Sequence, residues 1–129
     1  ELANRGADLH FERCIIYKLS IFLESGHREV PVFRFESASL THVTASQTRA
    51  VTSRGRPITL QLMDCRMRHC DFSFATLVAS CFIRCDLREV NFEGSDLSDT
   101  RFEDCLFDNC NFQLAVLADA ESSAANPNL

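Results

Sequence analysis

The sequence repeats a large apolar residue at every fifth position, a spacing that suits neither regular secondary structure. In the stretch CDLREVNFEGSDLSDTRFEDC, residues 85–105, the apolar series is Leu87, Phe92, Leu97 and Phe102. An amphipathic helix repeats its apolar positions about every 3.6 residues, and a half-buried strand does so every second residue. Steps of five spiral around a helix, and on a straight strand they leave every second apolar residue in water. The chain must therefore turn between successive repeats.

The five-residue period runs without a gap from residue 60 to residue 119, which divide into twelve pentads. The first position is small in every pentad after the first, and it holds Cys65, Cys85 and Cys105 in three of them. A short extended segment places the first and third positions on one face, which we expect to form the core. The third position is always large and apolar: Leu62, Met67, Phe72, Leu77, Phe82, Leu87, Phe92, Leu97, Phe102, Phe107, Phe112 and Leu117.

Comparison of positions twenty residues apart indicates that four pentads make one coil. Cys65, Cys85 and Cys105 then fall into one column. Two columns of third positions are also uniform: Phe72, Phe92 and Phe112 align, and so do Leu77, Leu97 and Leu117. A spacing of fifteen residues gives a poorer match. Neighbouring coils at about 4.8 Å would bury a shared core, as in solenoid proteins. The sequence therefore predicts a square tube.

The pentads CDFSF, CDLRE, VNFEG, SDLSD and CNFQL resemble those of the pentapeptide-repeat family. The family pattern is a small residue, Asp or Asn, Leu or Phe, and two variable positions. The resemblance implies an all-β fold, a right-handed quadrilateral β-helix. We expect about five coils, of which residues 60–119 form the regular part.

The other parts of the chain follow the pattern less closely. Residues 1–59 are predicted to form degenerate coils with loops at 24–32 and 53–59, where Ser25-Gly26 and Pro57 interrupt the pattern. An alternative is a capping hairpin, in which residues 9–24 pair with residues 30–36. Residues 120–129 are predicted to form a C-terminal cap or tail.

The sequence offers no catalytic chemistry that we recognise. It contains no HExxH, GxSxG, Walker A or GxGxxG motif. Most of the cysteines occupy inward slots of pentads, which favours small core residues over zinc ligands. Seven cysteines without a secretory signal favour a reducing, cytoplasmic compartment, and no apolar run is long enough to cross a membrane. We expect no enzyme activity, no cofactor, no metal and no membrane partner.

The charge favours a protein partner. The net charge is −5, and residues 60–119 hold 5 Lys and Arg against 11 Asp and Glu. This excess argues against direct binding of nucleic acid and favours a basic protein surface. Phe74 and Leu114 occupy outward slots that flank Gly94, and exposed apolar patches often mark interaction surfaces. His27 and Arg28 lie in the 24–32 loop, a common place for functional residues on a rigid scaffold.

We therefore expect a non-enzymatic protein–protein interaction or scaffold module. The family resemblance implies two alternatives. One is a DNA-mimicking protein of the quinolone-resistance type that binds a DNA topoisomerase (gyrase), with Asp96, Asp99 and Asp119 as acidic contacts. A short tube and a tail without an apolar segment argue against it. The other is one domain of a larger secreted bacterial effector that is delivered into a host cell. Open tube ends also make an end-to-end homo-oligomer an expectation.

Overall fold

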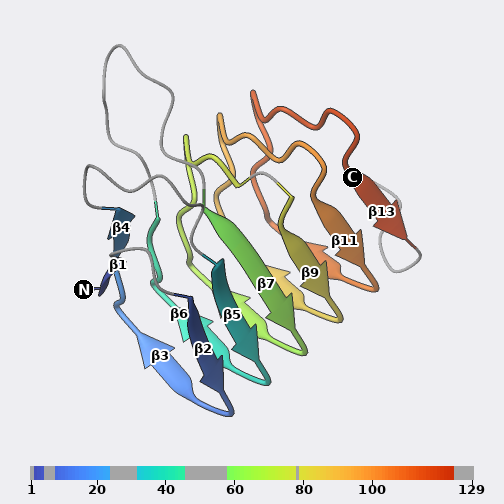
Figure 1. Cartoon of the computed structure of the whole chain (residues 1–129). Helices are drawn as coiled ribbons and strands as arrows, with labels where there is room; N and C mark the ends of the chain where they lie inside the picture. The colour runs from blue at the N-terminus through green and yellow to red at the C-terminus, as the bar shows by residue number, and fades with distance from the viewer. Residues whose placement is uncertain (1, 5–7, 24–31, 46–57, 78, 124–129) are drawn as a thin grey trace.

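The computed structural model describes residues 2–4, 8–23, 32–45, 58–77 and 79–123 (Figure 1). These residues form short strands and turns, and they contain no helix that could span a membrane. The strands are β1 (Leu2–Asn4), β2 (Leu9–Glu12), β3 (Ile15–Tyr17), β4 (Ile21–Leu23), β5 (Val32–Glu36), β6 (Ser39–Thr41), β7 (Thr59–Met63), β8 (Arg66–Arg68), β9 (Cys81–Ile83), β10 (Asp86–Arg88), β11 (Arg101–Glu103), β12 (Leu106–Asp108) and β13 (Glu121–Ser123).

Two parallel sheets form two adjoining walls of a tube. Wall 1 has the strand order β2-β5-β7-β9-β11-β13, and wall 2 has the order β3-β6-β8-β10-β12, while β1 pairs separately with β4. Figure 1 shows the strands of wall 1 side by side and pointing the same way. In the regular part, Gln61 pairs with Cys81, and Cys81 with Arg101, so that partners lie twenty residues apart. This register confirms the coil of four pentads.

Isolated β-bridges complete the other two sides of the tube. Wall 3 is a column of bridges from Ser20 through Thr44, Asp71 and Asn91 to Asn111. Wall 4 is a shorter column, in which Thr76 bridges Asp96 and Asp96 bridges Val116. With four walls per coil, the fold is a quadrilateral parallel β-solenoid, which confirms the predicted fold class.

The N-terminal strands continue the same walls at a wider spacing. Leu9 pairs with Phe33, 24 residues later, and Phe33 pairs with Leu60, 27 residues later. Because β2 and β5 are parallel, they belong to successive coils, and the alternative of a capping hairpin is wrong. Residues 24–31 and 53–57, and with them His27 and Arg28, lie outside the described residues.

Strands begin earlier and end later than the sequence predicts. Val32 and Thr59, both placed in loops by the sequence, are the first residues of β5 and β7 and pair with each other. Residues 121–123, expected in a cap or tail, form β13 and pair with β11. The wall-1 ladder therefore extends beyond the regular pentads at both ends.

The described corners of the tube use a left-handed backbone conformation. Among the described residues, sixteen have positive φ, between 50° and 64°. Twelve of them are the fifth positions of the regular pentads, and the other four are Arg13, Lys18, Ser37 and His42. Gly94 is the one glycine among the sixteen; the others include Asp64, Phe74 and Arg84. L-residues disfavour this conformation at a cost of about 1 kcal/mol or more each. The stacked coils must therefore offset strain at each corner.

The core contains the first and third positions of the pentads. Nine of the twelve third-position residues of the regular part are at most 2 % exposed. Their rings stack from coil to coil: the centroids of Phe82 and Phe102 lie 4.8 Å apart, and those of Phe92 and Phe112 lie 5.1 Å apart. The last coil departs from the expectation, because Phe107 and Phe112 are only partly buried and Leu117 is 38 % exposed. Among the described residues, only β13 follows this coil.

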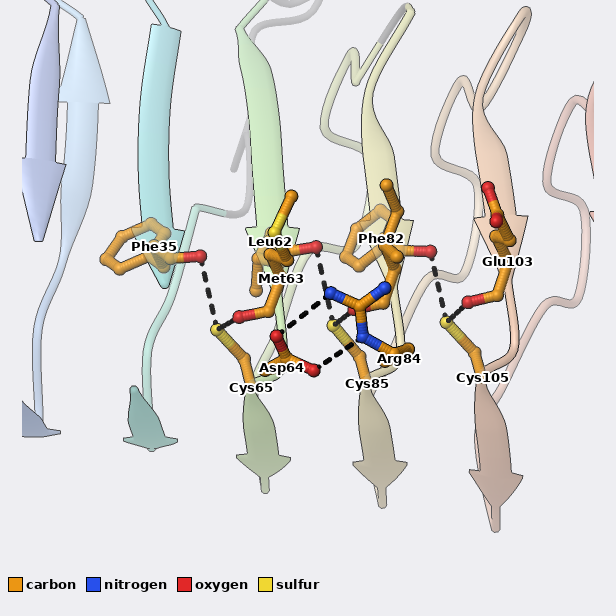
Figure 2. Close-up of polar contacts among 11 residues, drawn as sticks. Phe35, Leu62, Met63, Asp64, Cys65, Phe82, Arg84, Cys85, Glu103 and Cys105 are labelled. Carbon is orange, nitrogen blue, oxygen red and sulfur yellow. Dashed lines mark hydrogen bonds and ion pairs between the residues drawn. The ribbon is translucent and has the colours of Figure 1, made fainter. Parts of the chain in front are cut away.

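The cysteine column lies inside the tube (Figure 2). Cys65, Cys85 and Cys105 are buried free thiols, and their Sγ atoms lie 3.3, 3.6 and 3.1 Å from the carbonyl oxygens of Phe35, Leu62 and Phe82. The thiols of Cys105 and Cys65 on either side, and then burial, raise the pKa of Cys85. These contacts place the three thiols in the packed core of the tube.

We predict that Phe92→Ala lowers the free energy of unfolding by about 3–5 kcal/mol, since it removes a fully buried ring that contacts Phe72 and Phe82. The matched control is Leu117→Ala, at the same pentad position but in the partly open last coil. Urea denaturation followed by circular dichroism measures both. Equal losses would contradict the burial difference between the two sites.

Candidate functional site

The charges of walls 1 and 2 are largely compensated. In the regular coils these walls hold five Arg and six Asp or Glu. Arg84 donates two hydrogen bonds to Asp64, of 2.7 and 3.0 Å, across neighbouring coils (Figure 2). This contact lowers the pKa of Asp64 and raises that of Arg84. Arg68 and Arg88 lie 3.3 and 3.4 Å from Asp86. These two walls carry little net charge.

Walls 3 and 4 are different, because their regular part is acidic without compensation. Residues 70–79, 90–99 and 110–119 supply these walls, and they contain no Lys or Arg. The negative charge of the tube is therefore concentrated on two adjoining sides, which we call the acidic walls. Their acidic residues are Asp71, Glu93, Asp96, Asp99 and Asp119.

The three aspartates singled out by the sequence have different environments. Asp96 is half-buried, and its Oδ1 accepts hydrogen bonds from the backbone N–H (3.0 Å) and the hydroxyl (2.5 Å) of Ser98. Asp99 and Asp119 are exposed at the corner that follows wall 4. Asp99 and Asp119 therefore present exposed carboxylates, whereas that of Asp96 is engaged in a turn.

The contact of Asp96 recurs along walls 3 and 4 at the second position of the pentad. The side chains of Asp71, Asn91 and Asn111 each accept a hydrogen bond of 2.9 Å from the backbone N–H two residues later. Asp and Asn commonly stabilise turns in this way. The second-position Asp or Asn of these walls thus has a structural role, which the sequence analysis missed.

An apolar ridge lies at the corner between walls 3 and 4, formed by Phe74, Gly94 and Leu114. The backbone N–H of Phe74 donates to Glu93 and that of Gly94 to Gln113, so that the three residues stack in successive coils. A Cβ atom added to Gly94 would overlap the ring of Phe74, which therefore lies against the glycine. Phe74 is 53 % and Leu114 is 73 % exposed. The pair predicted from the sequence thus lies exposed in one column, with Gly94 between the two residues.

An aromatic column that the sequence pattern did not predict lies along another corner. The rings of His42 and His69 stack with centroids 5.3 Å apart, and Tyr17 meets His42 edge-on at 5.5 Å. The Nδ1 atom of His69 lies 2.5 Å from a carboxylate oxygen of Glu89. Only the unequal coil lengths before residue 60 bring these residues together, so the twenty-residue spacing could not reveal the column.

Wall 1 carries a shallow cavity of about 340 Å³ between β5, β7 and β9. Arg34, Met63, Cys81 and Ile83 are among its lining residues. Burial raises the pKa of Cys81, which keeps its thiol protonated and weakly nucleophilic. The cavity therefore presents no activated nucleophile.

Comparison with protein families identifies the class of protein. The model for pentapeptide repeats matches residues 61–94 and 95–121, with eight copies of the repeat. Residues 61–121 are therefore pentapeptide repeats, and this part of the chain belongs to the pentapeptide-repeat family. No curated protein sequence matches the chain.

The solved structures that are similar to this chain include two pentapeptide-repeat proteins of cyanobacteria. QnrB1, a plasmid-mediated fluoroquinolone resistance protein, is 15 % identical over 87 % of this chain and 57 % of its own, with a TM-score of 0.47. HetL of the cyanobacterium Nostoc sp. strain PCC 7120, involved in heterocyst differentiation regulation, is 16 % identical over 98 % of this chain and 72 % of its own (TM-score 0.34). Rfr23 of the cyanobacterium Cyanothece 51142 is 12 % identical over 71 % of this chain and 85 % of its own, with a TM-score of 0.29. This chain thus spans little more than half the length of QnrB1.

We predict that Asp96→Asn leaves stability unchanged to within about 0.5 kcal/mol, because an amide oxygen accepts the same hydrogen bond, as at Asn91. Asp96→Ala should cost about 1 kcal/mol, since the backbone N–H of Ser98 loses its acceptor. Urea denaturation measures both, with Asp99→Ala as the exposed control. A loss with Asn as large as with Ala would mean that the charge of Asp96, rather than the turn, matters.

Proposed function

We propose that this protein is a non-enzymatic binding module that docks a basic protein segment onto its apolar ridge. The observation that carries the proposal is the position of the ridge, at the corner where the two acidic walls meet. A partner segment with an apolar side chain between Lys or Arg residues would match the apolar ridge with its apolar side chain and the acidic walls with its positive charges.

The two parts of the surface have separate roles in this proposal. Aromatic side chains are enriched at the centres of protein interfaces, and burial of Phe74 and Leu114 would supply affinity. The uncompensated carboxylates of Glu93, Asp99 and Asp119 would attract a basic partner and speed its association, an effect that salt weakens. The stacked corners hold the ridge in place, so that binding costs little ordering of the backbone.

We expect Phe74→Ser and Leu114→Ser each to weaken capture of the partner by at least about tenfold, as loss of an interface anchor does. The experiment compares proteins retained from a lysate by the wild type and by these variants, and then measures the affinity of the purified partner. Ile15→Ser is the matched control, because Ile15 is 87 % exposed but lies on wall 2. Thermal denaturation verifies that all variants are folded.

Asp99→Lys together with Asp119→Lys should slow association and reduce its salt dependence. Glu103→Lys together with Asp108→Lys, which reverses the same number of charges on walls 1 and 2, is the control for net charge. A partner that is retained equally by the ridge variants and by Ile15→Ser would overturn the proposal.

A second candidate is a DNA-mimicking protein that binds a topoisomerase. The negative charge of walls 3 and 4 in the regular coils, which lack Lys and Arg there, favours it, and the similar structure of QnrB1 belongs to a fluoroquinolone resistance protein. The carboxylates of Asp71 and Asp96 are both engaged in turns, so this candidate depends on Glu93, Asp99 and Asp119.

A gyrase supercoiling assay, with and without a fluoroquinolone and at two salt concentrations, separates the two candidates. A DNA mimic should inhibit gyrase or protect it from the drug, lose the effect in high salt, and lose it in the Asp99→Lys, Asp119→Lys variant. The ridge proposal predicts no such effect. Inhibition that persists in the charge variant would contradict the acidic walls as the contact surface.

A further inference from the structure

Three side chains with metal-binding atoms converge on the outer face of wall 1, far from the apolar ridge. His10 and Glu12 lie two residues apart on β2 and therefore point to the same side of the sheet. Glu36 on β5 is the direct partner of Glu12 in the parallel ladder. One imidazole nitrogen and one oxygen from each carboxylate all lie within 4.8 Å of one another.

The spacing of these atoms is close to that of ligands on a zinc ion. Zn²⁺ binds His nitrogen and carboxylate oxygen at about 2.0–2.2 Å, so that two ligands of a tetrahedral site lie about 3.3 Å apart. The Nε2 atom of His10 lies 3.6 Å from Oε2 of Glu36. The paired backbones of β2 and β5 fix the Cα positions, and the exposed side chain of Glu12 needs only a change of rotamer to complete the set.

The charges around the cluster leave room for a cation. Glu12 and Glu36 face each other directly across the strands, an arrangement of like charges that is destabilising. Arg13 contacts Glu12 at 3.1 Å, but the nearby Arg34 donates its Nε–H to Gln61 at 3.0 Å. Among the described residues, His10 is the ion-pair partner of Glu36, and no Lys or Arg lies within ion-pair distance of it.

We propose that His10, Glu12 and Glu36 bind a divalent transition-metal ion, with Zn²⁺ as the best match. One imidazole and two carboxylates suit Zn²⁺, whereas Ca²⁺ and Mg²⁺ prefer six or more oxygen ligands. Three protein ligands leave a fourth position for water or for a group of a partner molecule. This site is independent of the binding function proposed above.

The test is titration of the purified, reduced protein with Zn²⁺ by calorimetry and with Co²⁺ by absorption spectroscopy. The wild type should bind one equivalent, and the Co²⁺ complex should lack the charge-transfer band that cysteine thiolates produce. His10→Ala and Glu36→Gln should each weaken binding by at least about tenfold, since loss of an outer-shell partner alone commonly costs that much. The matched control is His69→Ala, which removes an imidazole that also contacts a glutamate.

A second readout guards against binding elsewhere on the chain. Zn²⁺ should raise the melting temperature of the wild type and of His69→Ala, but not that of His10→Ala, because a ligand stabilises only the state that binds it. Without metal, all three proteins should melt alike. Absence of saturable binding in the wild type, unchanged affinity in His10→Ala, or a thiolate band with Co²⁺ would each overturn the proposal.

Discussion

The left-handed residue at the fifth position of each pentad determines the whole architecture. It turns the chain at a fixed point, so that four pentads close one coil and equivalent residues stack twenty positions apart. Most of these corners hold ordinary L-residues, which adopt this conformation at a cost of about 1 kcal/mol or more each. The next coil offsets that cost: Asp64 donates its backbone N–H to Ile83, and Arg84 donates to Glu103. A single coil would have the strain without these hydrogen bonds, so the fold is stable only as a stack.

Stacking converts a sequence period into columns of like or complementary side chains. Inside the tube, the columns are the Phe ladder and the thiols of Cys65, Cys85 and Cys105. Outside, neighbouring coils pair Arg84 with Asp64 and bring Phe74 against Gly94. The inward side chains must fill the core at close-packed density, whereas the outward side chains at the same spacing are free of this constraint. Differences in function between tubes of this kind are therefore expected on the outward positions of the walls and corners.

The sequence predicted the regular coils well because their period is set by local geometry. Twelve consecutive pentads were enough to infer the twenty-residue coil and most of the core. The corner conformation was missed because residues such as Phe74 and Arg84, unlike glycine, give no signal of positive φ. The structural role of Asp96 was missed because it depends on a backbone N–H two residues away. Leu117 is exposed because, among the described residues, only β13 follows its coil, and a repeat pattern does not show which coil lacks a covering neighbour. The cluster of His10, Glu12 and Glu36 depends on the 24-residue offset between β2 and β5, which the regular twenty-residue period does not predict.

A solenoid of this kind needs no deep cleft to form a binding surface. The backbone of each wall is held by hydrogen bonds to the coils on either side. The Cα atom of an exposed side chain is therefore already fixed in position before a partner binds. Binding affinity depends on a few well-placed anchors and on how little must be ordered, rather than on the area buried. A ridge of two apolar side chains between acidic walls meets both conditions, and it lies on different walls from the cluster on β2 and β5. Because distant sites without shared partners act additively, substitutions at one surface should leave the other unchanged. The tube can thus carry separate binding sites on separate walls while its core stays the same.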